Sequence, residues 1–152
     1  MKRLCKILAG VVIVAGGLGI AQAQFAGPDK AIKYRQAVMV LISEHFGRMG
    51  EVVKGKSAYD REHLAHDAAL VNTLAAMPWE AFMVPGADKG KTKLKPEALR
   101  EPAQFKKAAR QLEVEAAKLL TTAGTGDLDA IKKQFGEVAK SCKECHGQFR
   151  SK

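Results

Sequence analysis

Apolar residues recur at alternating three- and four-residue intervals through the last part of the chain, over residues 128–149. The members of this series are Leu128, Ile131, Phe135, Val138, Cys142, Cys145 and Phe149. Such spacing puts the side chains on one side of an α-helix and is typical of a helix that packs along its length in a bundle. Because no stretch shows the period-two alternation of a strand, we predict an all-α fold.

Two more helices are predicted in the first half of the chain. The first covers residues 28–53 and begins with Pro28, whose fixed φ suits the first helical turn. The second covers residues 60–77, with the carboxylate of Asp60 as its cap and Pro78 at its end. Both show apolar side chains at three- and four-residue spacings.

A long connection separates these helices from the second pair. Residues 79–100 are rich in Gly, Pro and Lys, which predicts a surface loop that folds over a ligand or crosses the end of a bundle. A third helix follows Pro102 and ends in a Gly-bearing segment at 123–126, and Asp127 caps the fourth. Two tight connections favour antiparallel neighbours, so we expect an up-down four-helix bundle.

The first helix contains an unbroken apolar run, Val38 to Ile42. Consecutive helical residues point around the whole circumference, so part of this run faces away from the bundle core. A dimer interface would cover it.

The N-terminus has the pattern of a secretory signal peptide. Met1-Lys2-Arg3 precedes an apolar stretch over residues 7–20, and Ala21-Gln22-Ala23 follows as a small-x-small cleavage pattern. The apolar stretch is shorter than the roughly 20 residues of a membrane span, so we expect no membrane anchor. We predict a signal peptide over residues 1–23, a single domain over residues 24–152, and export to the periplasm.

The chain is basic, with a formal net charge of +9. Loss of the leader lowers it to about +6, because residues 1–23 hold three basic and no acidic residues. Export argues against nucleic acid as the partner, so we interpret most of this charge as a solvated surface.

Cys142-Lys143-Glu144-Cys145-His146 has the C-x-x-C-H pattern of covalent haem attachment. The spacing puts both thiols on one helix face, where they can add to the two vinyl groups of a porphyrin, and His146 can then reach the iron. The pattern predicts one haem c, bonded through Cys142 and Cys145.

Two other interpretations of these cysteines remain open. A thioredoxin-like pair normally lies at the start of a helix, where the dipole lowers the thiol pKa, whereas these lie near a helix end. A zinc site would need a fourth ligand from another helix, such as His45, His63 or His66.

The sequence resembles the cytochromes c′, the class II c-type cytochromes, over nearly all of residues 24–152. The resemblance rests on a haem motif near the C-terminus and on four further segments. These are Lys33-Tyr34-Arg35-Gln36, Phe46-Gly47-Arg48-Met49, Pro78-Trp79 with Phe82, and Arg150 after the motif. The same architecture, an antiparallel four-helix bundle, is found in cytochrome c′.

The resemblance also implies roles for individual residues. His146 would be the proximal iron ligand, and Met39 would face the opposite side of the iron. Arg35 and Gln36 match positions that contact the haem propionates. Two aromatic residues and one cation complete the expected cofactor-binding set: Trp79 and Phe82 near the haem edge, and Arg150 on the proximal side.

By the same resemblance, the protein is expected to bind NO and CO at a five-coordinate, high-spin iron and to form a homodimer through its first two helices. The alternative is a six-coordinate, low-spin electron carrier in which the sulfur of Met39 is the sixth ligand. We expect no enzymatic activity, because a peroxidase would need a polar acid or base near Met39. The sequence does not identify the redox partner protein.

Overall fold

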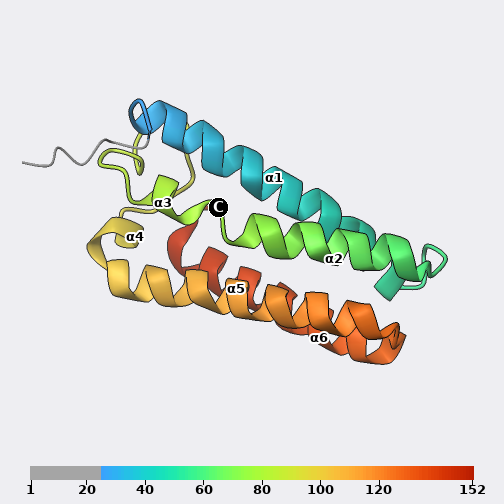
Figure 1. Cartoon of the computed structure of the whole chain (residues 1–152). Coiled ribbons are helices and arrows are strands. Elements are labelled where there is room, and N and C mark those ends of the chain that lie inside the picture. The colour runs from blue at the N-terminus through green and yellow to red at the C-terminus, as the bar shows by residue number, and fades with distance from the viewer. Residues whose placement is uncertain (1–24) are drawn as a thin grey trace, which may run out of the picture.

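The computed structural model describes residues 25–152, which form six helices (Figure 1). Four are long: α1 (Pro28–Val53), α2 (Arg61–Ala75), α5 (Pro102–Thr125) and α6 (Leu128–Phe149). Two are single turns: α3 (Trp79–Phe82) and α4 (Glu97–Arg100). The all-α prediction is confirmed, whereas the predicted signal peptide lies outside the described residues.

The four long helices form the predicted bundle. In Figure 1, α1 and α2 run side by side in opposite directions, and α5 and α6 form a second such pair beside them. The structure also packs α2 against α5, so successive long helices are neighbours. The antiparallel four-helix bundle is therefore confirmed.

Local signals set several helix ends. The Asp60 carboxylate accepts a 3.0 Å hydrogen bond from the backbone N–H of His63 and caps α2. Asp127 caps α6 in the same way. Between α5 and α6, Gly126 has φ of 79°, a left-handed conformation that other residues rarely adopt, so glycine is favoured there.

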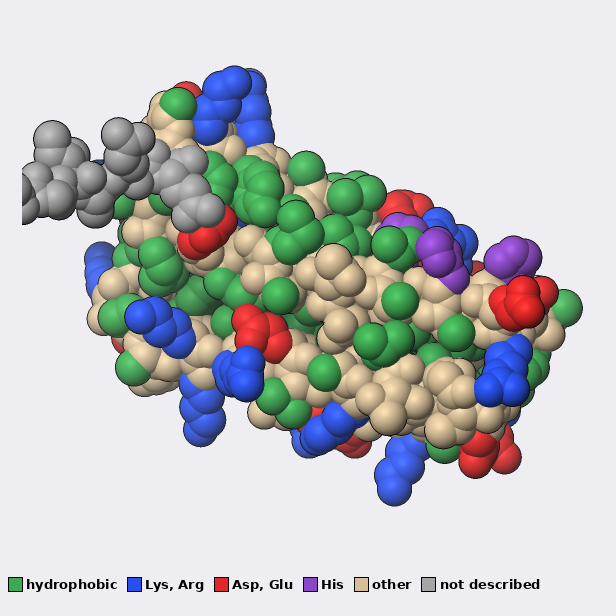
Figure 2. All heavy atoms as spheres, in the orientation of Figure 1, with side chains coloured by type: hydrophobic (Ala, Val, Ile, Leu, Met, Phe, Trp, Pro, Cys, Tyr) green, Lys and Arg blue, Asp and Glu red, His purple; other side chains and the backbone are tan. Residues whose placement is uncertain are grey.

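The apolar run in α1 faces two ways, as its sequence predicts. Val38 and Ile42 are buried, whereas Val40 and Leu41 are 57% and 46% exposed. Figure 2 shows hydrophobic side chains gathered along α1 on the face that this view presents. The bundle core lies on the other side of the helix, where Met49 packs in a cluster with residues of the other three long helices.

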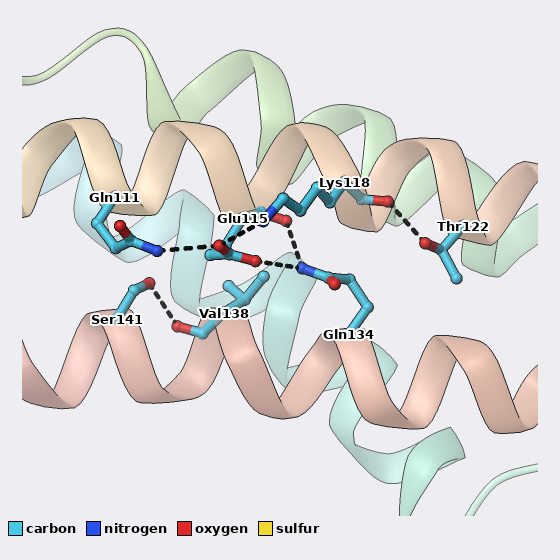
Figure 3. Close-up of polar contacts among 7 residues, drawn as sticks. All are labelled: Gln111, Glu115, Lys118, Thr122, Gln134, Val138 and Ser141. Atoms are coloured by element: carbon cyan, nitrogen blue, oxygen red, sulfur yellow. Dashed lines mark hydrogen bonds and ion pairs between the residues drawn. The ribbon is translucent and has the colours of Figure 1, made fainter.

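A buried carboxylate aligns α5 with α6 (Figure 3). Glu115 is only 6% exposed, and its carboxylate accepts hydrogen bonds from Gln134 at 2.7 Å and from Gln111 and Lys118 at 2.9 Å. Gln134 also donates to the backbone carbonyl of Glu115 at 3.1 Å. Sliding one helix past the other would break both contacts of Gln134, so they define the register of the pair.

The connection between α2 and α5 departs from the prediction in two respects. The second helix ends at Ala75 rather than at residue 77, and the segment predicted as a loop contains α3 and α4. These short helices bury Ala81 and Ala98 completely, and this packing outweighs the Gly, Pro and Lys content of the segment. Residues 91–95, called the strap below, pair with the chain end through an antiparallel bridge between Leu94 and Arg150.

Among residues 25–152, no helix combines the length and the apolar character needed to cross a membrane.

Candidate functional site

A cavity of about 1110 Å³ lies between α1 and α6, with α3, α5 and the strap around it. This volume is slightly above the usual range of ligand pockets, about 300–1,000 Å³. Every residue predicted to bind the cofactor lines it: Arg35, Gln36, Met39, Trp79, Phe82, Cys142, Cys145, His146 and Arg150. Residues far apart in the sequence are thus brought to one site.

One wall of the cavity presents the two thiols and the imidazole from α6. Burial raises the pKa of the Cys142 thiol, and it raises that of Cys145 to about 11, so both are protonated at neutral pH. Burial also lowers the pKa of His146, and the positive charge of Arg150 lowers it further. The neutral imidazole, which is the form that binds a metal, is therefore favoured.

This arrangement does not suit either alternative interpretation of the cysteines. The raised thiol pKa values are the opposite of what a reactive redox pair needs. Within residues 25–152 no three His, Cys, Asp or Glu side chains gather as metal ligands. His45 instead contacts Asp67, at 2.8 Å between Nδ1 and Oδ1.

The opposite wall comes from α1 and is apolar around Met39. Met39 is partly buried, and Val40, Ile42 and Phe46 line the cavity beside it. The hydroxyl of Ser43 also lines it but donates to the carbonyl of Val40 at 3.1 Å. The lining from this stretch of α1 therefore offers no acid or base to a ligand near Met39.

Arg35 has a structural role that the sequence did not reveal. The residue is 2% exposed, and its guanidinium donates to the carbonyls of Ala81 at 3.1 Å and Ala87 at 2.5 Å, and to the hydroxyl of Thr92 at 2.8 Å. It also lies 4.6 Å from the ring centre of Phe82. Burial lowers the pKa of Arg35 to about 10, so it stays charged. Its acceptors are mostly backbone carbonyls far along the chain, which no sequence signal marks.

Gln36 and the chain end hold the strap on its two sides. The Gln36 amide donates to the carbonyl of Lys91 at 2.9 Å. On the other side, the N–H of Ser151 donates to the carbonyl of Lys93 at 2.8 Å, and the N–H of Lys95 donates to the carbonyl of Phe149 at 2.9 Å. The strap therefore joins α1 to the segment just after His146.

The aromatic residues form a cluster at this end of the cavity. The Trp79 and Phe82 rings stack with their centres 5.9 Å apart, and Phe105 packs against both. The indole N–H of Trp79 is buried and has no acceptor among the described residues. A buried donor without a partner is costly, and a bound group with an acceptor at this point would satisfy it.

The residues present fit a covalently attached haem. The cavity is large, and its α1 wall around Met39 is apolar. It offers two thiols and a neutral imidazole on α6, and it contains a buried donor that lacks an acceptor. These are the donor set and the surroundings that the C-x-x-C-H pattern predicts.

Comparison with known proteins gives consistent matches. The family model described as Cytochrome C' matches residues 30–150. Cytochrome c' of Alcaligenes xylosoxydans xylosoxydans is 41% identical over 129 residues, which is 85% of this chain and 99% of that protein. Cytochrome c' of Rubrivivax gelatinosus is 42% identical over 130 residues, which is 85% of this chain and all of that protein.

Solved structures show the same fold. A mutant of cytochrome c prime from Alcaligenes xylosoxidans in complex with nitric oxide matches with a TM-score of 0.79 and 40% identity, over 85% of this chain and all of that chain. A second variant of that protein, with carbon monoxide bound, matches with the same TM-score, identity and coverage.

Proposed function

The chain belongs to the cytochrome c′ family, and from this we propose that it is an exported periplasmic cytochrome that binds NO and CO at a single five-coordinate haem. The observation that supports this most directly is the cavity, with two thiols and an imidazole on one wall and an apolar wall at Met39 opposite. The solved relatives with nitric oxide and carbon monoxide bound support the choice of ligands.

Cys142 and Cys145 would hold the haem through thioether bonds, and His146 would ligate its iron. When bound, the haem would supply an iron atom that can accept a small diatomic ligand. The buried N–H of Trp79 would donate to an acceptor group of a bound haem, whereas the amide of Gln36 donates to the carbonyl of Lys91. Arg150 keeps a positive charge beside His146, which favours its neutral, ligating form.

Met39 would obstruct ligand access from the α1 side of the cavity. Its thioether side chain is flexible and apolar, so it fills space at this wall of the cavity without donating a hydrogen bond. A ligand that bonds strongly to iron can displace the Met39 side chain. A weaker ligand such as O₂ gains too little binding free energy to offset the cost of moving it. Since the lining of α1 around Met39 supplies no acid or base, the site suits reversible binding rather than turnover.

A second function rests on the same residue. The sulfur of Met39 can itself ligate haem iron, which would give a six-coordinate electron carrier that exchanges electrons with a redox partner protein. Met39 lines the cavity and is partly buried, which is the observation that favours this alternative.

The protein acts as a homodimer through α1 and α2. The exposed Val40 and Leu41 support this, because adjacent large apolar side chains on one helix gain stability when a second copy covers them. Residues 1–23 direct export and are removed, and residues 24–152 form the mature domain.

Visible absorption spectra of the purified protein test the two functions. Five-coordinate iron gives high-spin bands, no sharp α-band on reduction, and a clear shift with NO or CO. Sharp low-spin bands that CO leaves unchanged would overturn the gas-binding proposal in favour of the electron carrier. Met39→Leu is the matched variant, because leucine keeps the apolar bulk but cannot ligate iron. If the protein is the gas-binding cytochrome, the spin state of the iron is the same in the variant and the wild type. If Met39 ligates the iron of an electron carrier, the spin state changes in the variant.

Intact mass tests the attachment. The exported protein is expected to begin at Gln24 and to contain one haem that survives denaturation. Cys142→Ser and Cys145→Ser each remove one thioether bond, and a double variant with covalent haem would contradict the assignment. Ser57→Ala is the control, because Ser57 is exposed and lies outside the cavity lining.

A further inference from the structure

The strap alternates between side chains that are anchored and side chains that are exposed. Thr92 accepts the hydrogen bond of Arg35, and Leu94 packs against the cluster of Ala98, Phe105 and Phe149. Lys91, which precedes Thr92, and Lys93, which lies between Thr92 and Leu94, are exposed at the rim of the cavity. This is the alternation of an extended chain, in which neighbouring side chains point to opposite sides.

The backbone of the strap is held on both edges, so the lysines project from a fixed base. The carbonyl of Lys91 is bonded to Gln36 of α1, and the carbonyl of Lys93 is bonded to the N–H and the hydroxyl of Ser151, at 2.8 and 3.2 Å. A charged surface on an ordered backbone loses less conformational entropy on binding than one on a free loop.

The charges of the strap lysines are not neutralised by the protein. Some cations of α5 and α6 pair with carboxylates, such as Lys118 with Glu115 at 2.9 Å and Arg110 with Glu113 at 2.9 Å. Among residues 25–152, Lys91 and Lys93 make no ion pair within 4.0 Å, and neither does Arg150. The carboxylate of Asp88, in the same loop, interacts with the charge of Arg35.

We propose that Lys91 and Lys93 of the strap, with Arg150 beside them, form a docking surface for a partner protein with an acidic face. Unpaired charges of one sign around a cavity raise the rate of encounter with a partner of the opposite sign and orient it. The bridge between Leu94 and Arg150 keeps the two parts of this surface together. The partner would therefore dock at the rim of the cavity, close to the proposed haem.

The chemistry favours a protein over an anionic membrane. Binding to a membrane surface combines basic residues with apolar side chains that enter the lipid. The exposed large hydrophobic residues of the described chain are Val40, Leu41, Tyr59 and Met77, and none belongs to the strap or to α6. The strap thus has the charges of a docking surface without the apolar residues of a membrane anchor.

The test measures binding of the haem-loaded protein to a 15-residue polyglutamate peptide by calorimetry at low salt. The variant is K91Q/K93Q, and the control is K132Q/K133Q, which removes the same charge near the opposite end of α6. We expect the strap variant to bind about 2- to 30-fold more weakly than the wild type, as expected for two exposed ion pairs. The control should bind nearly as well as the wild type, and each single strap variant should lose part of the affinity.

Three results would overturn the proposal. Equal weakening in the strap variant and the control would show that only net charge matters. Unchanged binding in K91Q/K93Q would show that the lysines are engaged elsewhere, for example with acidic groups of the haem. Strap-dependent binding to vesicles containing phosphatidylglycerol, without binding to the peptide, would assign the surface to a membrane. Peptide binding does not depend on NO, so failure here and failure of the gas-binding function are separate outcomes.

Discussion

The guanidinium of Arg35 donates a 2.8 Å hydrogen bond to the hydroxyl of Thr92, across a sequence separation of 57 residues. With its bonds to Ala81 and Ala87, this contact fastens α1 to α3 and to the strap. Since Met39 is one turn farther along α1 and the strap pairs with the segment after His146, Arg35 holds together the two sides of the cavity.

Arg35→Gln is expected to destabilise the protein by about 2–4 kcal/mol, because it removes charge-assisted hydrogen bonds and leaves buried carbonyls without donors. Urea unfolding of the haem-loaded protein measures the loss. Thr92→Val is the matched control: it removes the hydroxyl that accepts from this guanidinium and from the N–H of Leu94, and should cost about 1–2 kcal/mol. Equal stabilities of Arg35→Gln and the wild type would contradict this role.

Met39→Ala is expected to increase the rate of CO binding by about 5- to 150-fold, if moving a packed side chain aside costs about 1–3 kcal/mol. Stopped-flow mixing of the reduced protein with CO measures the rate. Val84→Ala, in the connection outside the cavity lining, is the control. A rate that is unchanged in Met39→Ala would mean that Met39 does not obstruct the ligand.

The variant L41E is expected to be a folded monomer. Leu41 is exposed and lies outside the cavity lining, so the charge costs the isolated bundle little, but in a dimer it would be buried and would repel its counterpart. Analytical ultracentrifugation at micromolar concentration distinguishes the two states. Ala117→Glu, on an exposed position of α5, should stay dimeric like the wild type, and a monomeric wild type would contradict the dimer.

Acid should weaken the protein partly through Glu115. Hydrogen bonds from Gln134 and then Lys118 lower the pKa of Glu115 below its ordinary value of 4.5. A lowered pKa in the folded state means that the unfolded chain takes up the proton first, so this stabilisation is complete above pH 4.5 and is lost as the pH falls through the folded pKa.

As the pH falls from about 6 to about 3, the free energy of unfolding of Glu115→Gln is therefore expected to decrease less than that of the wild type. At about pH 6 the variant is expected to be the less stable of the two. Urea unfolding across this range measures the slope. Glu137→Gln, at an exposed position of α6, should keep the slope of the wild type. A wild-type slope in Glu115→Gln would show that this carboxylate does not contribute.

The helices could be predicted closely where local signals define them. α1 spans the residues expected for it, and α6 begins directly after its cap, Asp127. The end of α2 was overestimated by two residues, because Met77 is apolar but lies beyond the helix, partly exposed. The short helices α3 and α4 were missed, since their stability comes from tertiary burial of alanines rather than from propensity.

The amino-acid sequence by itself determined the helical periods, the caps and the spacing of Cys142, Cys145 and His146, because these depend on residues three or four positions apart on one helix. The tertiary structure alone decided which groups meet across the cavity. The bonds of Arg35 to backbone carbonyls and the pairing of the strap with the chain end are examples. Every residue has such carbonyls, so nothing in the side-chain order indicates which of them a distant guanidinium or N–H will reach.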